Sequence, residues 1–252
     1  MKVTIIGSGN VATVFGKKIL EAGHSILQVI GRNQQRAKFL ADALGTTSLT
    51  DIAGISSAAD IYIFAVSDMS LTDLGKKVHF ENKIAVHTAG SVSKEVLSKI
   101  TSNYGVIYPL QTLRKEIPSP ENIPVLVDAS NKPTLRAITE FASSFSGYVG
   151  PADDAVRLSF HLAATIINNF TNHLLMLTEN YCLDQQIDFR HLAPLMEETV
   201  KRAFHFHPVL VQTGPAMRGD ISTIQKHLEA LAEYPELRKI YDIFTMSIGK
   251  FK

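Results

Sequence analysis

Two glycines and an alanine near the start of the chain have the spacing of a phosphate-binding turn. Gly7, Gly9 and Ala12 follow the apolar, β-rich run 3–6 without a gap, and a helical pattern begins at Val11. The first glycine permits a tight turn, the second lets a pyrophosphate approach the backbone, and a small third residue lets the helix pack closely on the strand. The start of the helix also offers unpaired N–H groups to the phosphates. This segment predicts dinucleotide binding.

The end of the next β-rich run, 25–30, indicates which dinucleotide is bound. Sites that prefer NAD usually carry Asp or Glu here, which accepts a hydrogen bond from the ribose 2′-hydroxyl. This chain has Arg32 and Asn33 instead, and an arginine can hold a 2′-phosphate through charge-assisted hydrogen bonds. The alternative is a solvated arginine at the start of the next helix. We therefore expect NADP rather than NAD. The predicted cofactor-binding residues are Gly7, Ser8, Gly9, Asn10, Val11, Arg32, Asn33, Val66 and Ser67.

Small or polar residues also follow the later β-rich runs. The continuous apolar run 60–66 leads into Ser67, and the run 84–87 leads into residues 88–91. The carboxyl ends of parallel strands meet at one edge of an open sheet, where ligands bind. His87 and Ser91 are therefore candidates for chemistry at this edge, although a histidine at a strand end is more often structural.

The helix expected over 155–181 is apolar on most sides and carries one polar stripe, so we expect it to be central to the second half. Polar groups on a buried helix cost roughly 1–3 kcal/mol each when they are unpaired. The stripe is therefore expected to face a water-filled seam, partner groups or a ligand. We take His161 as a candidate proton donor or orienting group, and Asn169 as a candidate hydrogen-bonding group for a substrate. The stripe consists of His161, Thr165, Asn168, Asn169 and Asn172.

The two halves of the chain that position these candidate residues differ in their predicted secondary structure. Up to residue 152, β-rich runs alternate with helical patterns, which predicts an α/β fold with a Rossmann-like, doubly wound and mostly parallel sheet. From residue 153 onward only the helical period remains. We expect a Rossmann-like NADP-binding domain over 1–152 and an all-helical substrate or dimerisation domain over 153–252.

The helical half also predicts a homodimer. Ile166, Ile167 and Phe170 point in several directions from one helix, and Phe204 and Phe206 add further apolar surface. Exposed apolar patches above a few hundred Å² are uncommon on monomers, so a two-fold partner is the expected cover. The alternative is that this helix packs under the Rossmann-like half.

The composition of the whole chain is that of an ordinary globular protein. Its 252 residues are 45% hydrophobic and 19% charged, with a net charge of +1, so neither nucleic acid nor a membrane surface is an expected partner. The single cysteine, Cys182, excludes an internal disulfide and fits the reducing cytoplasm. The first strand is expected to begin at residue 3, so we expect no leader. The sequence has no run of 18 apolar residues, so we expect no membrane span. His205 and His207 lack a further ligand at motif spacing, so no metal site is expected.

The order of the motifs carries a resemblance over nearly the whole chain. After the glycine turn come His-Thr-Ala-Gly-Ser at 87–91, Tyr-Pro-Leu-Gln at 108–111, Phe-His at 160–161, Asn-Asn at 168–169 and Gly-Pro-x-x-Arg-Gly-Asp at 214–220. This order resembles an uncharacterised family of predicted NADP oxidoreductases. In that family a Rossmann half similar to deazaflavin-dependent NADP reductase precedes a helical domain of unknown function.

A more distant resemblance is to pyrroline-5-carboxylate reductase and to the β-hydroxyacid dehydrogenases, whose helical domain is like the C-terminal domain of 6-phosphogluconate dehydrogenase. It implies a helical domain that dimerises and a small-molecule substrate between the domains. The β-hydroxyacid dehydrogenases place a proton-transferring lysine one turn before an Asn-Asn pair, and here Thr165 occupies that position. Two functions are therefore open. One is an NADP-dependent oxidoreductase that transfers a hydride between NADP(H) and a small C=O or C=N substrate, and the other is a non-catalytic NADP-binding sensor or scaffold.

Overall fold

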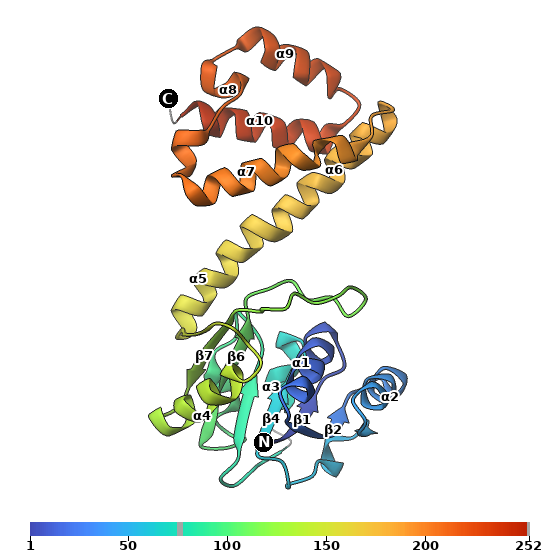
Figure 1. Ribbon diagram of the computed structural model, residues 1–252, viewed down its shortest axis with the longest axis vertical. Coiled ribbons are helices and arrows are strands. Elements are labelled where there is room, and N and C mark those ends of the chain that lie inside the picture. The colour runs from blue at the N-terminus through green and yellow to red at the C-terminus, as the bar shows by residue number, and fades with distance from the viewer. Residues whose placement is uncertain (75–77, 251–252) are drawn as a thin grey trace. The chain divides into compact units, whose positions relative to one another are not determined.

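The computed structural model describes residues 1–74 and 78–250, and the chain forms two compact units (Figure 1). The first unit, Met1–Thr165, is built on a β-sheet, and the second unit, Ile166–Lys252, is built from helices.

The sheet of the first unit has the strand order β3-β2-β1-β4-β5-β6-β7-β8. Strands β1 to β6 are parallel, β7 pairs antiparallel with β6, and β8 pairs parallel with β7. The direction of strand order reverses between β1 and β4, which creates a switch point at their carboxyl ends. The predicted Rossmann-like, mostly parallel sheet is thus confirmed. Its strands are β1 (Lys2–Ile6), β2 (Ser25–Ile30), β3 (Thr47–Leu49), β4 (Ile61–Phe64), β5 (Ile84–His87), β6 (Asn103–Pro109), β7 (Val125–Ala129) and β8 (Val149–Pro151).

Both faces of this sheet are covered, which explains the continuous apolar runs of its central strands. Alternate residues of β4 point to opposite faces, so Ile63 packs in the cluster that contains Phe15 of α1, whereas Phe64 packs in the cluster that contains Leu71 of α3. The helices of this part are α1 (Asn10–Glu21), α2 (Gln34–Ala43), α3 (Asp68–Leu74) and α4 (Lys132–Ser143), with 3₁₀ turns at Ile52–Gly54 and Lys94–Leu97.

The remaining elements are helical, as the sequence predicts. The helix expected over 155–181 is present as α5 and α6, but a π-helical segment, Thr165–Phe170, stands between them. Segments of this kind occur often at functional sites. The helices of this half are α5 (Asp154–Ala164), α6 (Thr171–Asp184), α7 (Ala193–His205), α8 (Pro215–Arg218), α9 (Ile221–Ala230) and α10 (Pro235–Gly249), with 3₁₀ turns at Phe189–Leu192 and Pro208–Val211.

The two compact units meet between residues 165 and 166, not at the expected position between 152 and 153. The reason is that α5 is tied to the sheet unit by a buried cation. Arg157 is 1% exposed, and its Nη2 donates hydrogen bonds to the carbonyl of Val92 and to Oδ1 of Asp154. The backbone N–H of Lys94 donates to the same Asp154 oxygen at 3.2 Å. The first helix of the helical half therefore packs with the sheet.

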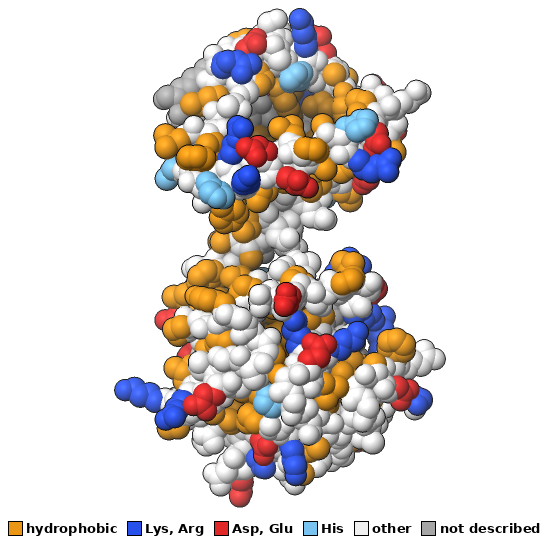
Figure 2. All heavy atoms as spheres, viewed as in Figure 1, with side chains coloured by type: hydrophobic (Ala, Val, Ile, Leu, Met, Phe, Trp, Pro, Cys, Tyr) orange, Lys and Arg blue, Asp and Glu red, His pale blue; other side chains and the backbone are white. Residues whose placement is uncertain are grey.

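The helical unit buries few of its apolar side chains, although we expected its long helix to be central. In the part of this unit that the structure describes, the buried hydrophobic residues are Cys182 and Leu231. Ile167 and Phe170 are 68% and 61% exposed. Figure 2 shows hydrophobic side chains spread over the visible face of this unit. Over the described ranges, no helix has the length and apolar content needed to cross a bilayer.

Candidate functional site

The two glycines of the first turn have different roles. Gly7 has a φ of 133°, and a Cβ at this position would collide with the backbone carbonyl of Ala65, directly after β4. Only glycine fits there. Gly9 is the N-cap residue of α1, and a Cβ at this position would meet nothing within 4 Å. Because no side chain caps this helix, the first-turn N–H groups stay available for a phosphate, and the turn fits a dinucleotide.

The other predicted cofactor residues lie at the carboxyl ends of β1, β2 and β4, which are neighbours in the sheet. Arg32 is exposed, and within the described ranges its side chain forms no ion pair. Asn33 has a structural role, because its Oδ1 accepts a 2.9 Å hydrogen bond from the N–H of Arg36 and caps α2. Val66 is half-buried, and the Ser67 hydroxyl lies 2.9 Å from that of Ser70.

His161 forms a pair with Tyr108, a residue to which the sequence motifs assigned no role. Tyr108 lies near the end of β6 and His161 lies on α5, and the distance from Tyr108 Oη to His161 Nδ1 is 3.0 Å. The rings meet edge to face at 76°. Burial raises the pKa of Tyr108, so its hydroxyl keeps its proton at neutral pH. A Cβ at Gly90 would lie 2.7 Å from His161 Nδ1, so glycine is what makes room for this pair.

His87 lies inside the sheet unit and not at its open edge. The side chain is 0% exposed, and Nδ1 accepts a 3.2 Å hydrogen bond from the N–H of Ala89. Burial, helped by the positive charge of Arg157, lowers the pKa of His87 to about 4. The ring is therefore neutral, and because Nδ1 is the acceptor, its proton is on Nε2. These surroundings favour the structural alternative for His87.

Ser91 is exposed at the expected edge, where it connects two loops. Its hydroxyl donates a 2.6 Å hydrogen bond to Oδ2 of Asp68, the first residue of α3. This contact joins the segment after β4 to the segment after β5, and both residues stay accessible.

Arg157 and Asp154 are positioning residues that the sequence motifs did not reveal. Burial raises the pKa of Asp154, but hydrogen bonds from Ser93 and Arg157 lower it further than burial raises it, so the carboxyl group is ionised. Arg157 precedes His161 by one helical turn, so its anchoring fixes the ring that contacts Tyr108. An arginine inside an apolar helical pattern was the available signal.

Asn169 is exposed on the π-helical segment, outside the compact unit that holds the Tyr108–His161 pair. Its Oδ1 lies 3.5 Å from Nδ2 of Asn168. Thr165, which stands where the related dehydrogenases have lysine, donates its hydroxyl proton to the carbonyl of His161 at 2.9 Å.

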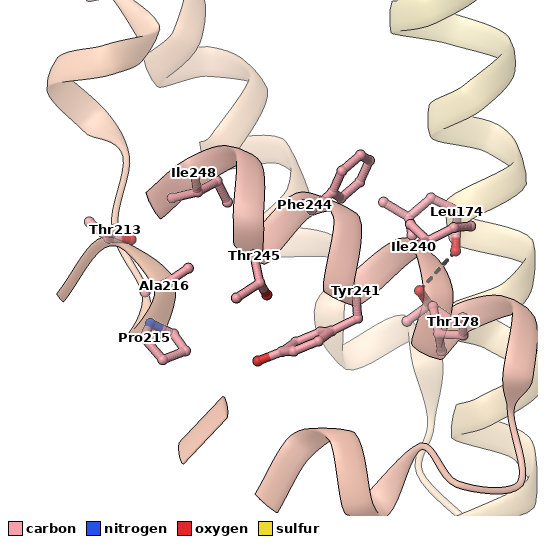
Figure 3. Close-up of a pocket in the computed structure, with 12 residues that line it drawn as sticks. Leu174, Thr178, Thr213, Pro215, Ala216, Ile240, Tyr241, Phe244, Thr245 and Ile248 are labelled. Carbon is pink, nitrogen blue, oxygen red and sulfur yellow. Dashed lines mark hydrogen bonds between the residues drawn. The ribbon is translucent and has the colours of Figure 1, made fainter. Parts of the chain in front are cut away.

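The helical unit has an apolar cavity of about 340 Å³ between α6, α8 and α10 (Figure 3). Leu174, Ile240 and Phe244 line it together with Pro215 of the Gly-Pro motif. Two of the hydroxyls that line it are paired: Thr178 donates to the carbonyl of Leu174 at 2.8 Å, and Tyr241 Oη lies 2.8 Å from His227 Nδ1. Among the residues with described positions, no three His, Cys, Asp or Glu side chains are grouped to hold a metal ion.

Comparisons with known proteins agree with this two-part architecture. Residues 2–101 match the family model "NADP oxidoreductase coenzyme F420-dependent", and residues 123–248 match a domain of unknown function, DUF2520. A crystal structure of a "putative NADP oxidoreductase" from Bacteroides fragilis is 33% identical, covers 99% of this chain and 98% of its own, and has a TM-score of 0.91. No curated protein matches the sequence.

Two more distant structures share the fold. A reductive aminase from Aspergillus terreus, in complex with NADPH and ethyl levulinate, is 14% identical, with 99% of this chain and 97% of its own covered and a TM-score of 0.71. A 1-pyrroline-5-carboxylate reductase from Streptococcus pyogenes is 15% identical, with 99% and 98% covered and a TM-score of 0.64.

Proposed function

Since the chain belongs to the family of NADP oxidoreductases that carry a DUF2520 domain, we propose that it transfers a hydride between NADP(H) and a small C=O or C=N substrate. NADP dependence follows from the family, as the motifs predicted. The substrate class is supported by the names of the two distant relatives, a reductive aminase and a pyrroline-5-carboxylate reductase. The observation that carries the proposal is the Tyr108–His161 hydrogen bond on the unit with the glycine turn.

NADPH, when bound, supplies the hydride, and the chain supplies a proton to the oxygen or nitrogen of the reduced substrate. We assign this proton to His161. In the protonated ring, Nδ1 donates to the Tyr108 oxygen and Nε2 donates to the substrate atom. Loss of the Nε2 proton leaves a neutral ring whose Nδ1 proton still points at Tyr108. Tyr108 therefore orients the ring through the whole step.

The other predicted residues take lesser roles in this proposal. Ser91 stays a candidate for a substrate contact because it is exposed, and Asn169 stays a candidate hydrogen-bonding group. His87 is left out of proton transfer because it is fully buried. Arg32 and the residues of the glycine turn are assigned to NADPH.

The test is turnover of NADPH with ketones, oxo acids, cyclic imines, ketone–amine mixtures and a deazaflavin. We expect oxidation with a carbonyl or an imine, and we expect His161→Ala to lower kcat by about 10²–10⁴-fold while the Kd of NADPH stays within about twofold. The exposed His205→Ala is the matched control. Tight NADPH binding without turnover of any compound would favour the sensor alternative.

We further infer that the protein is a homodimer formed through its helical unit. Phe204 and Leu210 are 83% and 79% exposed, and the apolar cavity of Figure 3 opens on the same unit. A second copy of the chain would remove this apolar surface from water, and a stable interface of this kind buries more than about 1,000 Å².

The single, buried Cys182 also suits a reducing compartment such as the cytoplasm.

Sedimentation tests the dimer. We expect a mass near twice the 27.7 kDa of the chain, and a shift toward 27.7 kDa in Phe204→Asp. Phe39→Asp is the control, because Phe39 is 74% exposed on the sheet unit. A wild-type mass of 27.7 kDa at micromolar concentration contradicts the dimer.

A further inference from the structure

A cavity of about 260 Å³ lies between α1 and α2 in the sheet unit. Ser8 of the glycine turn and Arg36 and Phe39 of α2 line it, and Lys115 joins them from the segment after β6. The cavity borders the end of β2, because Ser8 Oγ lies 3.1 Å from the position of a Cβ on Gly31. In this fold the adenosine ribose of a dinucleotide lies at the end of β2.

The segment 110–124 crosses α1, and its backbone is held there by hydrogen bonds with side chains of α1 (Figure 1). The N–H of Lys115 donates to Oδ1 of Asn10 at 3.4 Å, and Nζ of Lys18 donates to the carbonyl of Glu121 at 2.7 Å. Leu113 is 7% exposed and belongs to the main core of the sheet unit. The position of Lys115 is therefore fixed by contacts on both sides of it.

The charges that face this cavity are both positive. Arg36 and Lys115 line it and no carboxylate does, and neither side chain forms an ion pair with any residue whose position is described. Two cations at one cavity repel each other, and an anion between them removes this repulsion. The dianionic 2′-phosphate of NADPH is the group that distinguishes NADPH from NADH at this end of the sheet.

We propose that Lys115 binds the 2′-phosphate of NADPH together with Arg36, and so contributes to the preference for NADPH over NADH. The inference rests on the assigned cofactor but not on the substrate. Arg32, Asn33 and Arg36 follow β2 directly, whereas Lys115 reaches the phosphate from a segment about 80 residues later. No dinucleotide fingerprint in the sequence points to it.

The experiment compares Lys115→Gln, Lys115→Arg and a matched control, Lys17→Gln. Lys17 lines the adjacent cavity of about 400 Å³ but not this one. Fluorescence titration gives the Kd of NADPH and NADH for each variant, and competition gives that of 2′,5′-ADP and 5′-ADP. We expect Lys115→Gln to weaken NADPH and 2′,5′-ADP about tenfold, with NADH and 5′-ADP within about twofold, since a charge-assisted contact is lost. Lys115→Arg should retain most of the affinity, and Lys17→Gln should change neither.

Equal weakening of NADPH and NADH in Lys115→Gln overturns the inference, because Lys115 would then hold the pyrophosphate or the segment itself. An unchanged NADPH affinity overturns it as well, and so does a wild-type protein that does not prefer NADPH. A wild-type protein with this preference but without turnover contradicts the proposed reaction and leaves the role of Lys115 intact.

Discussion

The two units of this molecule bury their apolar residues in different ways. In the sheet unit, both faces of the sheet carry a cluster of buried side chains, and Ile63 and Phe64 on one strand serve opposite faces. In the described part of the helical unit, Cys182 and Leu231 are the buried hydrophobic residues, while Phe204 is 83% exposed. The first unit therefore has a core of its own, whereas the second exposes much of its apolar surface.

The polar side chains show the same difference. The sheet unit contains the buried side chains of Arg157 and His87, and Arg157 is held there by hydrogen bonds to the Val92 carbonyl and to Asp154. The charged pairs of the helical unit, such as Arg202 with Glu198, lie in solvent. Charged contacts should therefore contribute more to the stability of the first unit than to that of the second, because screening by water weakens exposed pairs.

The largest difference is expected for a phenylalanine removed from each unit. Phe64→Ala should lower the free energy of unfolding by about 3–5 kcal/mol, because a large side chain at 0% exposure leaves a cavity. This loss should be the same at any protein concentration. Phe204→Ala should reduce only the part of the stability that rises with protein concentration, since it removes surface that a second copy covers in the proposed dimer. Urea unfolding at two protein concentrations measures both.

The comparison would fail if Phe64→Ala cost less than about 1 kcal/mol, or if Phe204→Ala lowered stability equally at both concentrations. The second result would mean that Phe204 is buried within its own chain.

The fold of the sheet unit was predictable because its signals are local. The β-rich runs, the glycine turn and the helical patterns each specify an element, and right-handed parallel connections then fix the order of the strands. The boundary at residue 165 was not predictable in the same way. It depends on Arg157, whose contacts with Val92 and Asp154 exist only once the sheet has formed.

The candidate site was predictable in part. His161 was a candidate from its place in a polar stripe, but its partner Tyr108 lies 53 residues earlier, and no periodic pattern connects them. His87 shows the opposite case. A strand-end position suggested a rim residue, whereas burial in the folded chain makes it neutral and inaccessible. Residues that act through tertiary contacts, such as Lys115, leave no signal in a motif.

Acid should destabilise the sheet unit because of its buried histidine, His87. The folded-state pKa of His87 is about 4, below its usual value of 6.5, so only the unfolded chain binds this proton between those two pH values. Stability should therefore fall as the pH drops from 6.5 to 4, and this group should contribute roughly 2–4 kcal/mol of the loss. Unfolding by urea at pH 7, 5.5 and 4.5 measures the slope. His87→Asn should flatten it, and His205→Asn, exposed on the helical unit, is the control. An unchanged slope in His87→Asn would show that other groups set the acid response.

A smaller difference is expected between two arginines. Arg157→Met should lower the free energy of unfolding by about 2 kcal/mol, because it removes hydrogen bonds to the Val92 carbonyl and to Asp154 from a buried site. It should also lower kcat, since α5 carries His161. Arg202→Met removes an exposed pair with Glu198 and should leave the melting temperature unchanged. Calorimetry and NADPH turnover test both variants. Equal effects of the two substitutions would contradict the expectation that buried charged contacts stabilise the sheet unit more than exposed pairs stabilise the helical unit.

The smallest effect is expected for the loss of a helix N-cap, and it should be of the same kind in both units because an N-cap depends only on local structure. Asn131 caps α4 of the sheet unit by accepting a 2.9 Å hydrogen bond from the N–H of Thr134, and Asp220 caps α9 of the helical unit through the N–H of Thr223 at 3.0 Å. Asn131→Ala should lower the free energy of unfolding by about 1 kcal/mol. Asp220→Ala should lower the melting temperature as well, and neither loss should depend on protein concentration, since an N-cap bonds its own helix and needs no cover from a partner. Thermal melts of both variants at two concentrations measure this. If the Asp220→Ala loss grew with concentration, the capped end of α9 would belong to the surface that a second copy covers, and the local and associative contributions of the helical unit would not be separable.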